Sequence, residues 1–394
     1  MADGRTVFLV AGEESGDRLG ADLMAAIRER EPKTRFLGVG GSAMKAQGLS
    51  SIFSMVDIAV MGFTAVFGRL PLLVRRIRQT AAAVIEASPD VLVIIDSPDF
   101  THRVARRVRR RRPDIPIVDY VSPTVWVWRP GRARKMRGFV DRLLAILPFE
   151  PAVHERLGGP PCTYIGHPLI EKLDRLRPAE GERRNLGDGP PVLLVLPGSR
   201  RLEIDRLMPF FGRALGRIVA EVGEIEVLLP AVSHLRGEIE ARLADWPVRP
   251  KIVSGEGGKH SAFRRAHAAL AASGTVTLEL ALAGIPMAVA YRAEWPLRVM
   301  KRMNILLGRP IKLDTMVLAN IILGDKAIPE FLDEEVTAES LAATLLPLLT
   351  DGDERRRQTD AFARLDALMA LPDGDTPSGR AAEIVLEAAA KRGA

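Results

Sequence analysis

Residues 91–100 are Val91-Leu92-Val93-Ile94-Ile95-Asp96-Ser97-Pro98-Asp99-Phe100, five apolar residues followed by a polar turn. An unbroken apolar run of this length is typical of a strand that is buried on both faces of a parallel sheet. Ser and Asp residues directly after it favour the start of a helix, because their side chains satisfy free backbone N–H groups there. This stretch therefore predicts one strand-to-helix unit of an α/β sheet.

Similar units lie on both sides of this stretch in the first half of the chain. We expect strands at 6–10, 36–39, 115–120 and 142–146, with helices over about 19–30 and 71–87. Pro71 suits the first turn of the second helix, where its missing N–H is not needed. The alternation predicts right-handed βαβ units and a doubly wound sheet.

The pattern stops at a Gly- and Pro-rich segment and then starts again. We expect further strands at 192–196, 225–229, 251–253, 268–271 and 286–290. The predicted fold is α/β, with two Rossmann-like domains and an interdomain cleft. Its predicted parts are an N-terminal domain at 1–175, a linker at 176–190, a second domain at 191–350, and C-terminal helices at 351–394 that pack back on the first domain.

Composition limits the classes of protein that this chain can be. With 394 residues, 47% hydrophobic and 27% charged, it is expected to fold as two domains. Cys162 is the single cysteine, which excludes an intramolecular disulfide framework and fits a reducing, cytoplasmic compartment. The most apolar long stretch, 280–291, falls short of the roughly 20 residues that a membrane-spanning helix needs.

The formal net charge is +7, and two arginine-rich segments at 106–112 and 129–137 concentrate it. Such clusters attract phosphate, whether from nucleic acid, anionic lipid or nucleotide. A solvated helix face is the alternative interpretation of the 106–112 segment. With 5% aromatic residues, little base stacking is available, so we do not expect nucleic acid as a partner.

Polar residues follow the first and third predicted strands, where ligands bind in a parallel sheet. After the first strand, the glycine turn that contains Glu13, Ser15, Gly16 and Asp17 has neither dinucleotide-binding nor P-loop spacing. It suits either a ligand's polar groups or an ordinary strand-to-helix turn. Asp96 is placed to accept a proton from a substrate hydroxyl, whereas we expect Asp99 to cap the following helix.

Two comparable turns occur in the second domain. In Pro197-Gly198-Ser199-Arg200, Gly198 permits close approach of the backbone, Ser199 can cap the next helix and Arg200 can pair with a pyrophosphate. The turn Ser273-Gly274-Thr275 opens a helix that carries Glu279, whose carboxylate can accept both hydroxyls of a ribose. A capped helix with a surface glutamate is the alternative.

No metal or cofactor is expected. The six histidines lack ligand spacing, and the Asp-Gly-Asp pairs near residues 351 and 373 do not follow core strands. His167, just before the linker, is the histidine that we expect near the cleft.

One segment combines apolar and basic residues in a way that suits a membrane surface. Its apolar members are Phe63, Val66, Phe67, Leu70 and Leu73. Arginines lie among and after them, and such a combination can rest in a bilayer interface without crossing it. Core packing is the alternative.

A set of short motifs makes the sequence similar to the lipid-A-disaccharide synthase family over about residues 6–350. The motifs are Gly12-Glu13, Ser15-Gly16-Asp17, Ala59-Val60-Met61-Gly62, Asp96, Pro98-Asp99-Phe100, Tyr120-Val121-Ser122-Pro123, Trp126, Trp128-Arg129, Leu147-Pro148-Phe149-Glu150, Ile165-Gly166-His167, Leu196-Pro197-Gly198-Ser199-Arg200 and Ala272-Ser273-Gly274-Thr275.

The resemblance implies a GT-B fold and an inverting, metal-independent glycosyltransferase of lipopolysaccharide synthesis in Gram-negative bacteria. Its partners would be UDP-2,3-diacylglucosamine as donor and lipid X, which is 2,3-diacylglucosamine 1-phosphate, as acceptor. The donor sugar would pass to the 6-hydroxyl of lipid X, giving the β-1,6 disaccharide 1-phosphate and UDP. The enzyme would associate peripherally with anionic lipid on the cytoplasmic face of the inner membrane.

By position, the resemblance makes Asp96 the general base. It places Arg200 on the UDP phosphates, Glu279 on the ribose and Asn320 near the donor. Ser122 and Trp126, like His167, are candidate acceptor or cleft residues. Thr101 and Ala319 depart from residues that are common in the family, which affects fine acceptor contacts and not the reaction.

Two other interpretations stay open on the sequence alone. One is another UDP-sugar-dependent GT-B enzyme, of the peptidoglycan glycosyltransferase or UDP-N-acetylglucosamine epimerase type, although the Ser122-Pro123 and Trp126 motifs argue against it. The other is a non-catalytic phosphate-binding or nucleic-acid-binding protein that uses the basic surface.

Overall fold

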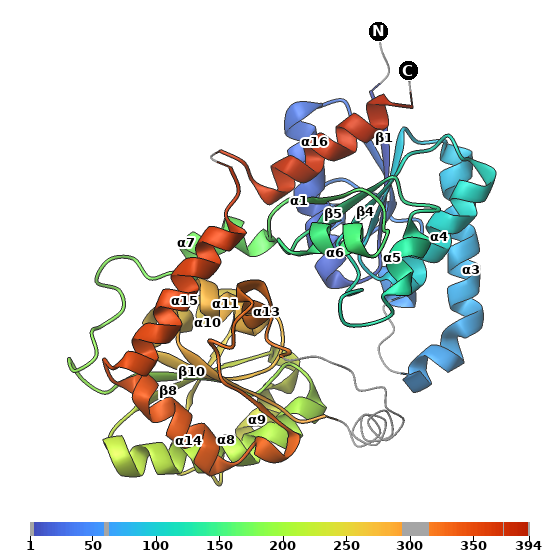
Figure 1. The fold of residues 1–394 in the computed structure, drawn as a ribbon. Helices are drawn as coiled ribbons and strands as arrows, with labels where there is room; N and C mark the ends of the chain where they lie inside the picture. Colours follow the sequence, from blue (N-terminus) through green and yellow to red (C-terminus); the bar gives the residue numbers. More distant parts are fainter. Residues whose placement is uncertain (1–3, 59–62, 294–314, 373, 393–394) are drawn as a thin grey trace. The chain divides into compact units, whose positions relative to one another are not determined.

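The computed structural model describes residues 4–58, 63–293, 315–372 and 374–392, and of residues 63–68 it describes the backbone only. Contacts divide the chain into two units (Figure 1). Unit 1 comprises residues 1–170 and 369–394, and unit 2 comprises residues 171–368. The chain thus leaves the first unit once and returns to it near its end.

Unit 1 is built on a six-stranded sheet in which all pairs are parallel. The strands are β1 (Thr6–Ala11), β2 (Arg35–Val39), β3 (Val91–Ile95), β4 (Ile117–Tyr120), β5 (Arg142–Ala145) and β6 (Cys162–Tyr164). Their order in the sheet is β2-β1-β3-β4-β5-β6. The chain places β2 on one side of β1 and all later strands on the other side, so the switch point lies between β1 and β3. In such sheets the ligand-binding loops lie at this switch point.

Helices cover both faces of this sheet. They are α1 (Glu14–Arg30), α2 (Ser42–Ala46), α3 (Phe63–Ala87), α4 (Pro98–Arg111), α5 (Gly131–Met136), α6 (Glu150–Arg156) and α16 (Pro377–Ala390). Strand residues alternate between faces. Val7 and Leu9 therefore pack with α1 and α16, whereas Phe8 and Val10 pack with α3 and α4.

Unit 2 repeats the architecture with the strand order β12-β11-β10-β7-β8-β9. The strands are β7 (Val192–Leu196), β8 (Glu226–Ala231), β9 (Lys251–Ser254), β10 (Ala268–Ala272), β11 (Met287–Tyr291) and β12 (Glu330–Leu332). The helices are α7 (Leu173–Leu176), α8 (Arg201–Val222), α9 (Arg236–Arg242), α10 (Gly255–Arg265), α11 (Val276–Leu282), α13 (Leu318–Leu323), α14 (Ala338–Leu345) and α15 (Asp353–Met369). Its switch point lies between β7 and β10.

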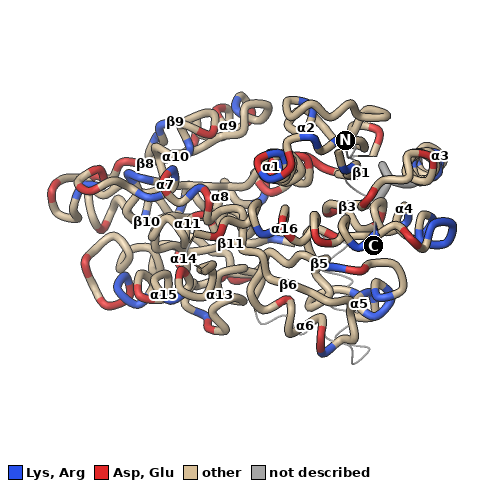
Figure 2. Tube along the Cα trace, turned by 90° about the horizontal axis from the view of Figure 1, so that it is seen from above, with Lys and Arg blue, Asp and Glu red and all other residues tan. Residues whose placement is uncertain are grey.

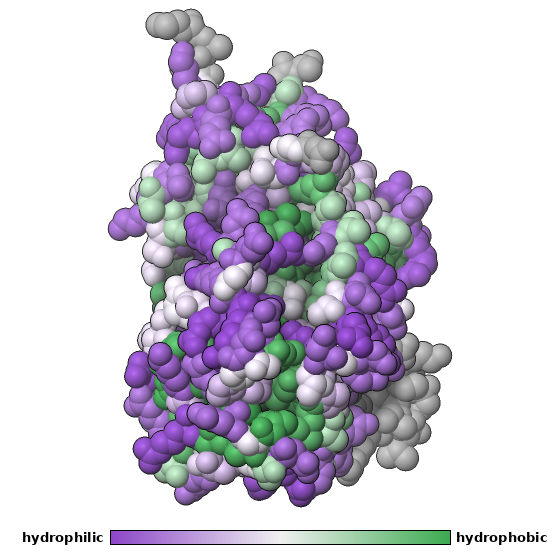
Figure 3. All heavy atoms as spheres, turned by 90° about the vertical axis from the view of Figure 1, so that its left-hand side faces the viewer, coloured by the Kyte–Doolittle hydropathy of each residue, from purple (hydrophilic) through white to green (hydrophobic). Residues whose placement is uncertain are grey.

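Short 3-10 helices connect several of these elements. They occupy Met55–Asp57, Pro168–Lys172, Ser233–Leu235, Asp333–Glu335 and Leu346–Leu349. The face that Figure 3 draws is mostly hydrophilic, with apolar side chains in patches between polar ones, as is ordinary for the surface of a folded protein.

Two differences between the structure and the sequence prediction concern helices. Helix α3 begins at Phe63, so Pro71 lies inside it and not in its first turn. One proline removes one backbone hydrogen bond, and a long helix with many others can continue past it. The segment predicted as C-terminal helices is divided between the units: α15 belongs to unit 2, whereas α16 packs beside α1 in unit 1 (Figure 1).

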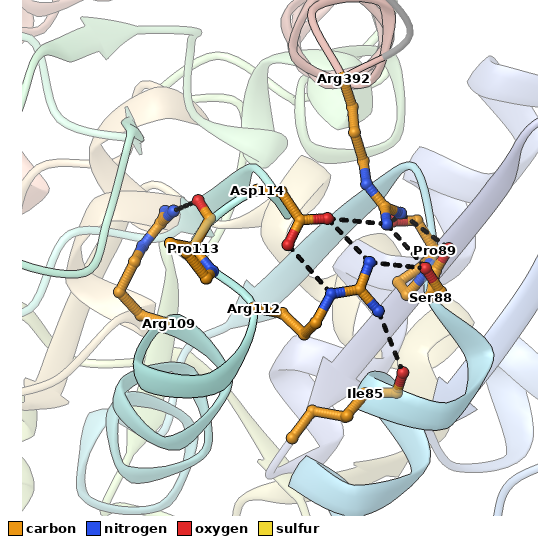
Figure 4. A network of polar contacts seen from close by, with 8 residues as sticks. All are labelled: Ile85, Ser88, Pro89, Arg109, Arg112, Pro113, Asp114 and Arg392. Atoms are coloured by element: carbon orange, nitrogen blue, oxygen red, sulfur yellow. Dashed lines mark hydrogen bonds and ion pairs between the residues drawn. The ribbon is translucent and has the colours of Figure 1, made fainter.

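A polar network fixes the chain that follows α16 (Figure 4). Arg392 donates to Asp114 at 3.0 Å and to the Ser88 hydroxyl at 2.7 Å, and Arg112 donates to the same two groups at 2.7 and 2.9 Å. The Arg112 guanidinium holds the pKa of the Asp114 carboxyl well below its usual range. Arg109 donates to the Pro113 carbonyl at 2.6 Å. The end of the 106–112 segment is therefore structural.

Candidate active site

Asp96 lies directly after β3, at the switch point of the first sheet. One of its carboxylate oxygens, Oδ1, accepts the N–H of Ser97 at 2.7 Å, and the Ser15 hydroxyl donates to Oδ2 at 3.4 Å. Asp96 and Ser97 have φ angles of +54° and +45°. Backbone strain of this kind in residues other than glycine is concentrated at functional sites. The strained turn presents a half-buried carboxylate at the edge where ligands bind.

The loop after β1 contacts the loop after β3. The Ser97 hydroxyl donates to Glu13 Oε1 at 2.9 Å. A Cβ on Gly12 would lie 2.4 Å from the Ser97 Cβ, and one on Gly16 would lie 3.2 Å from the Ile95 carbonyl oxygen. Both glycines therefore permit the close approach that brings Glu13 and Ser15 to Asp96.

Asp17 does not belong to this group, contrary to its prediction as a cleft residue. Its side chain is buried, and its carboxylate accepts the N–H groups of Gly41, Ala43 and Met44 at 2.6, 2.8 and 3.1 Å. These bonds satisfy free donors at the start of α2. Asp17 thus holds the β2–α2 loop against α1.

Asp99 is not the helix cap that the sequence predicts. Ser97 is the N-cap residue of α4 and makes no side-chain capping bond. The Asp99 carboxylate instead accepts from Arg132 at 3.1 Å and lies 4.0 Å from Arg129. It is therefore part of a charged surface between α4 and the segment around α5.

A buried pair beneath this loop was not found by sequence reasoning. His102 Nε2 and Asp119 Oδ2 lie 2.8 Å apart, both almost without solvent exposure. Burial raises the pKa of Asp119, and the attraction of His102 partly opposes that rise. The charges of Asp96 and Arg132 also act on this pKa, so the pair lies within the electrostatic field of the site. The sequence feature that could have revealed this pair is Asp119, a carboxylate within the apolar stretch 115–120.

Ser122 and Trp126 belong to a second polar cluster, behind the loop that follows β4. The Ser122 hydroxyl lies 2.9 Å from His154 Nε2, and the Trp126 ring packs edge-on against Phe149 at 5.3 Å. Burial lowers the pKa of His154 to about 4 and raises the pKa of Glu150 to about 7. Ser122 is buried, so this cluster supports the loop from inside.

His167 lies in the loop after β6. It is half-buried, and its Nδ1 accepts the N–H of Leu169 at 3.2 Å.

In unit 2, the turn after β7 is organised by Glu203. Its Oε2 accepts the N–H groups of Ser199 and Arg200 at 3.1 and 3.3 Å, and its Oε1 accepts from the Arg200 guanidinium at 3.0 Å. A Cβ on Gly198, whose φ is +114°, would lie 2.5 Å from the same carboxylate. Arg200 remains 67% exposed. The N–H and guanidinium groups that are expected to bind phosphate are thus present, and the Glu203 carboxylate accepts hydrogen bonds from them.

The turn after the neighbouring strand β10 carries Ser273, Gly274 and Thr275, of which the last two are exposed. Glu279, one turn into α11, forms an ion pair with Lys259. Lys259 follows a glycine-rich start of α10 that sequence reasoning did not single out. The Glu279 carboxylate is therefore largely buried and already paired with a cation.

Asn320, which the resemblance places near the donor, has both ends of its amide engaged by the protein. It is buried, and its amide bonds both the carbonyl and the N–H of Ile328 at 2.9 Å. A third bond joins it to the Thr315 hydroxyl at 3.3 Å. Asn320 therefore joins α13 to the chain before β12 and offers no free polar group at the surface.

The segment predicted to contact a membrane lies partly within the described residues. Leu70 is 44% exposed and Leu73 packs partly against the core, whereas the side chains of Phe63, Val66 and Phe67 and the motif at 59–62 lie outside the described residues. Among the described residues, no helix combines the length and the apolar character needed to cross a bilayer. The same residues hold no group of three or more His, Cys, Asp or Glu side chains suited to a metal ion.

Structures with a similar fold are UDP-sugar enzymes and glycosyltransferases. The Neisseria meningitidis UDP-GlcNAc 2-epimerase bound to UDP-GlcNAc has a TM-score of 0.63 at 11% identity, covering 98% of this chain and 100% of that one. The calicheamicin glycosyltransferase CalG4 has a TM-score of 0.57 at 18% identity, covering 100% and 99%. These likenesses confirm the prediction of two Rossmann-like domains of the GT-B type.

Sequence comparison identifies the family. The profile described as "Lipid-A-disaccharide synthetase" matches residues 7–372. Proteins named lipid-A-disaccharide synthase match from Nitrobacter hamburgensis at 55% identity, covering 98% of both chains, and from Rhodospirillum centenum at 43%, covering 98% of this chain and 95% of that one. Because the match extends over nearly the whole length, the chain belongs to the lipid-A-disaccharide synthase family, glycosyltransferases of lipid A biosynthesis.

Proposed function

We propose that this protein transfers 2,3-diacylglucosamine from UDP-2,3-diacylglucosamine to the 6-hydroxyl of lipid X, with inversion at the anomeric carbon and without a metal ion. Membership of the family supports the reaction. The observation that carries the assignment of roles is Asp96, whose carboxylate is held at the switch point of the first sheet by Ser15 and Ser97.

In the proposed reaction, Asp96 acts as general base. The acceptor hydroxyl loses its proton to the Asp96 carboxylate while its oxygen forms the new bond to the anomeric carbon. The bond from that carbon to the phosphate oxygen breaks, and its electron pair leaves with UDP. Attack from the side opposite the leaving group inverts the configuration, so one base is sufficient.

Unit 2 would bind the donor. Arg200 and the backbone N–H groups of Ser199 and Arg200 can stabilise the negative charge that develops on UDP as it leaves. Glu203 accepts from those N–H groups, so the phosphates of the donor would take the place of its carboxylate. Glu279 and the turn at Ser273 would contact the ribose, with Lys259 adding positive charge nearby.

We further propose that the enzyme works peripherally at the cytoplasmic face of the inner membrane. Both substrates carry acyl chains and therefore partition into a bilayer. Leu70 is exposed on α3, and basic residues are frequent on α4 and α5, a combination that suits an anionic lipid surface.

Mass spectrometry tests the reaction directly. The protein is mixed with UDP-2,3-diacylglucosamine and lipid X in detergent, with and without EDTA. A tetraacyl disaccharide 1-phosphate formed equally in both samples is the expected result. Product only without EDTA would contradict metal independence, and no product in either sample would contradict the proposed acceptor or donor.

A further inference from the structure

A cavity of about 430 Å³ in unit 1 lies between α4 and the segment that contains α5. Its lining is mostly basic, and Figure 2 shows Lys and Arg on both helices. The lining residues are Pro98, Asp99, His102, Arg103, Arg106, Arg129, Gly131, Arg132 and Lys135. Five of these side chains are cationic, and Asp99 alone carries a carboxylate. The cavity therefore has a strong excess of positive charge.

This charge is incompletely neutralised by the protein itself. Asp99 pairs with Arg132 and, more distantly, with Arg129. Among the residues that the structure describes, no carboxylate lies within ion-pair distance of Arg103, Arg106 or Lys135. Burial lowers the pKa of Arg106, and repulsion from Arg132 and Arg103 lowers it further. An anion in the cavity would relieve that repulsion.

Two arginines of the cavity lie over aromatic rings, which favours a fixed orientation of their guanidinium groups. The Arg106 guanidinium stacks over the Phe139 ring at 4.7 Å, and Arg129 lies 5.4 Å from the Trp128 ring. Arg129 also has a φ of +55°, a strained conformation for a residue with a side chain. Stacked, planar guanidinium groups match the oxygens of a phosphate better than flexible lysines do.

The cavity is adjacent to the candidate base. It begins at Pro98, two residues after Asp96. Asp119, buried beneath both, is influenced by the charges of Asp96 and of Arg132, which lines the cavity. A ligand held in the cavity by its anionic end would lie beside the first turn of α4, directly after the loop that carries Asp96.

We infer that this cavity binds the phosphate monoester of the acceptor and so selects a phosphorylated sugar. The inference rests on the proposed function, because it assigns the acceptor to unit 1. It identifies Arg103 and Arg106, together with Arg129, as residues that determine acceptor specificity. Arg109 and Arg112, from the same arginine-rich segment, are used in structural contacts instead.

Steady-state kinetics with two acceptors test the inference. Lipid X is compared with 2,3-diacylglucosamine, which lacks the phosphate, in the wild type and in an R103Q/R106Q variant. Both arginines are exposed, so the fold is expected to persist. The variant should raise KM for lipid X by roughly tenfold or more. Its kcat and its KM for the acceptor without phosphate should stay close to wild type.

A matched control separates this effect from a general loss of charge. The R107Q/R110Q variant removes two positive charges from the same helix, and neither residue lines the cavity. It should leave the preference for lipid X unchanged. An equal rise in KM in both variants, or an equal rise for both acceptors in R103Q/R106Q, would overturn the inference.

Two further measurements are needed. One distinguishes a sugar phosphate from a lipid headgroup as the ligand of the cavity, and the other distinguishes failure of this inference from failure of the proposed function. Nuclear magnetic resonance titration with glucosamine 1-phosphate, against glucosamine, measures binding without turnover. If the protein makes no disaccharide but binds the phosphorylated sugar through Arg103 and Arg106, the proposed function fails and the phosphate site stands. If R103Q/R106Q loses binding to phosphatidylglycerol vesicles and keeps its preference for lipid X, the cavity holds a lipid headgroup and the inference fails.

Discussion

The Ser97 hydroxyl donates to Glu13 Oε1 at 2.9 Å and so joins the loop after β3 to the loop after β1. These loops flank the switch point of the first sheet, and Asp96, in the loop after β3, also accepts from Ser15 at the start of α1. The carboxylate proposed as base is thus positioned by contacts from both loops. Its orientation depends on residues that are more than 80 positions apart in the sequence.

Replacing Asp96 with Asn should nearly abolish turnover, because an amide cannot accept the hydroxyl proton. General base catalysis contributes about 10²–10⁴-fold, so a loss in kcat of that size is expected. UDP binding should stay close to wild type, since the donor groups lie in unit 2. Glu14→Gln, an exposed carboxylate that pairs with Arg18, is the matched control. Retained activity in D96N would refute the base assignment.

Replacing Gly12 with Ala should disturb the site through packing. The added Cβ would lie 2.4 Å from the Ser97 Cβ, so the two loops must separate. Overpacking of this kind costs about 1–3 kcal/mol of stability, measured by urea unfolding, and activity should fall with it.

A second substitution at Ser97 tests the clash directly, because it removes the side chain that the Cβ added at position 12 would meet. Ser97→Gly in the Gly12→Ala background should recover much of the lost stability but not the bond to Glu13. Gly237→Ala is the control, because nothing lies within 4 Å of a Cβ there. Equal stability of G12A and G237A would show that the loops do not approach as closely as described.

Replacing Arg200 with Ala should weaken UDP binding by roughly tenfold, through loss of a charge-assisted bond to phosphate. Isothermal titration calorimetry with UDP measures the effect. Arg201→Ala is a close control, because Arg201 is adjacent, is 66% exposed against 67% for Arg200, and pairs with Glu238 instead. Equal affinities of the two variants would exclude a phosphate role for Arg200.

The pKa of Glu150, raised by burial to about 7, predicts how stability depends on pH. Between pH 4.5 and 7, the folded state holds a proton on Glu150 that the unfolded state has released, so this residue makes stability fall as pH rises. Glu150→Gln removes that contribution. The difference in unfolding free energy, variant minus wild type, should therefore increase by about 3 kcal/mol across this range.

The pKa shift of His154 changes the pH dependence of stability in the opposite direction to that of Glu150. The wild type measured alone therefore does not isolate the contribution of Glu150. Burial lowers the pKa of His154 to about 4, so its contribution makes stability rise with pH up to the unfolded value near 6.5. In the wild type the two slopes oppose each other. Urea unfolding of wild type and E150Q at several pH values separates them, and a constant difference between the two proteins would contradict the raised pKa of Glu150.

The sequence predicted the parallel sheets and the turns that carry Asp96, Arg200 and Glu279. An apolar run and its flanking turn are local features, and the carboxyl ends of parallel strands share one edge. For that reason the sequence predicts that the turns after β1 and β3 lie at the ligand-binding edge of the sheet. The membership in the family followed from the same local motifs.

Several side chains could not be assigned in this way. Asp17 and Asn320 resemble site residues in their motifs, yet their polar groups are used by Gly41 and Ile328. The pairing of His102 with Asp119 joins α4 to the next strand, β4, and depends on how that helix packs on the sheet. Hydrogen-bond partners of this kind depend on which backbone groups tertiary packing brings within about 3 Å.

The arginines between 103 and 112 show most clearly which properties follow from the sequence and which depend on the tertiary structure. By itself, the sequence determined that a dense positive charge follows a core strand, with a solvated helix face as one of two interpretations. Tertiary structure alone decided that Arg112 shares Asp114 and Ser88 with the distant Arg392, whereas Arg106 faces a cavity with Arg132. The physical reason is that a charge responds to every group within a few ångströms, and most of those groups come from distant parts of the chain.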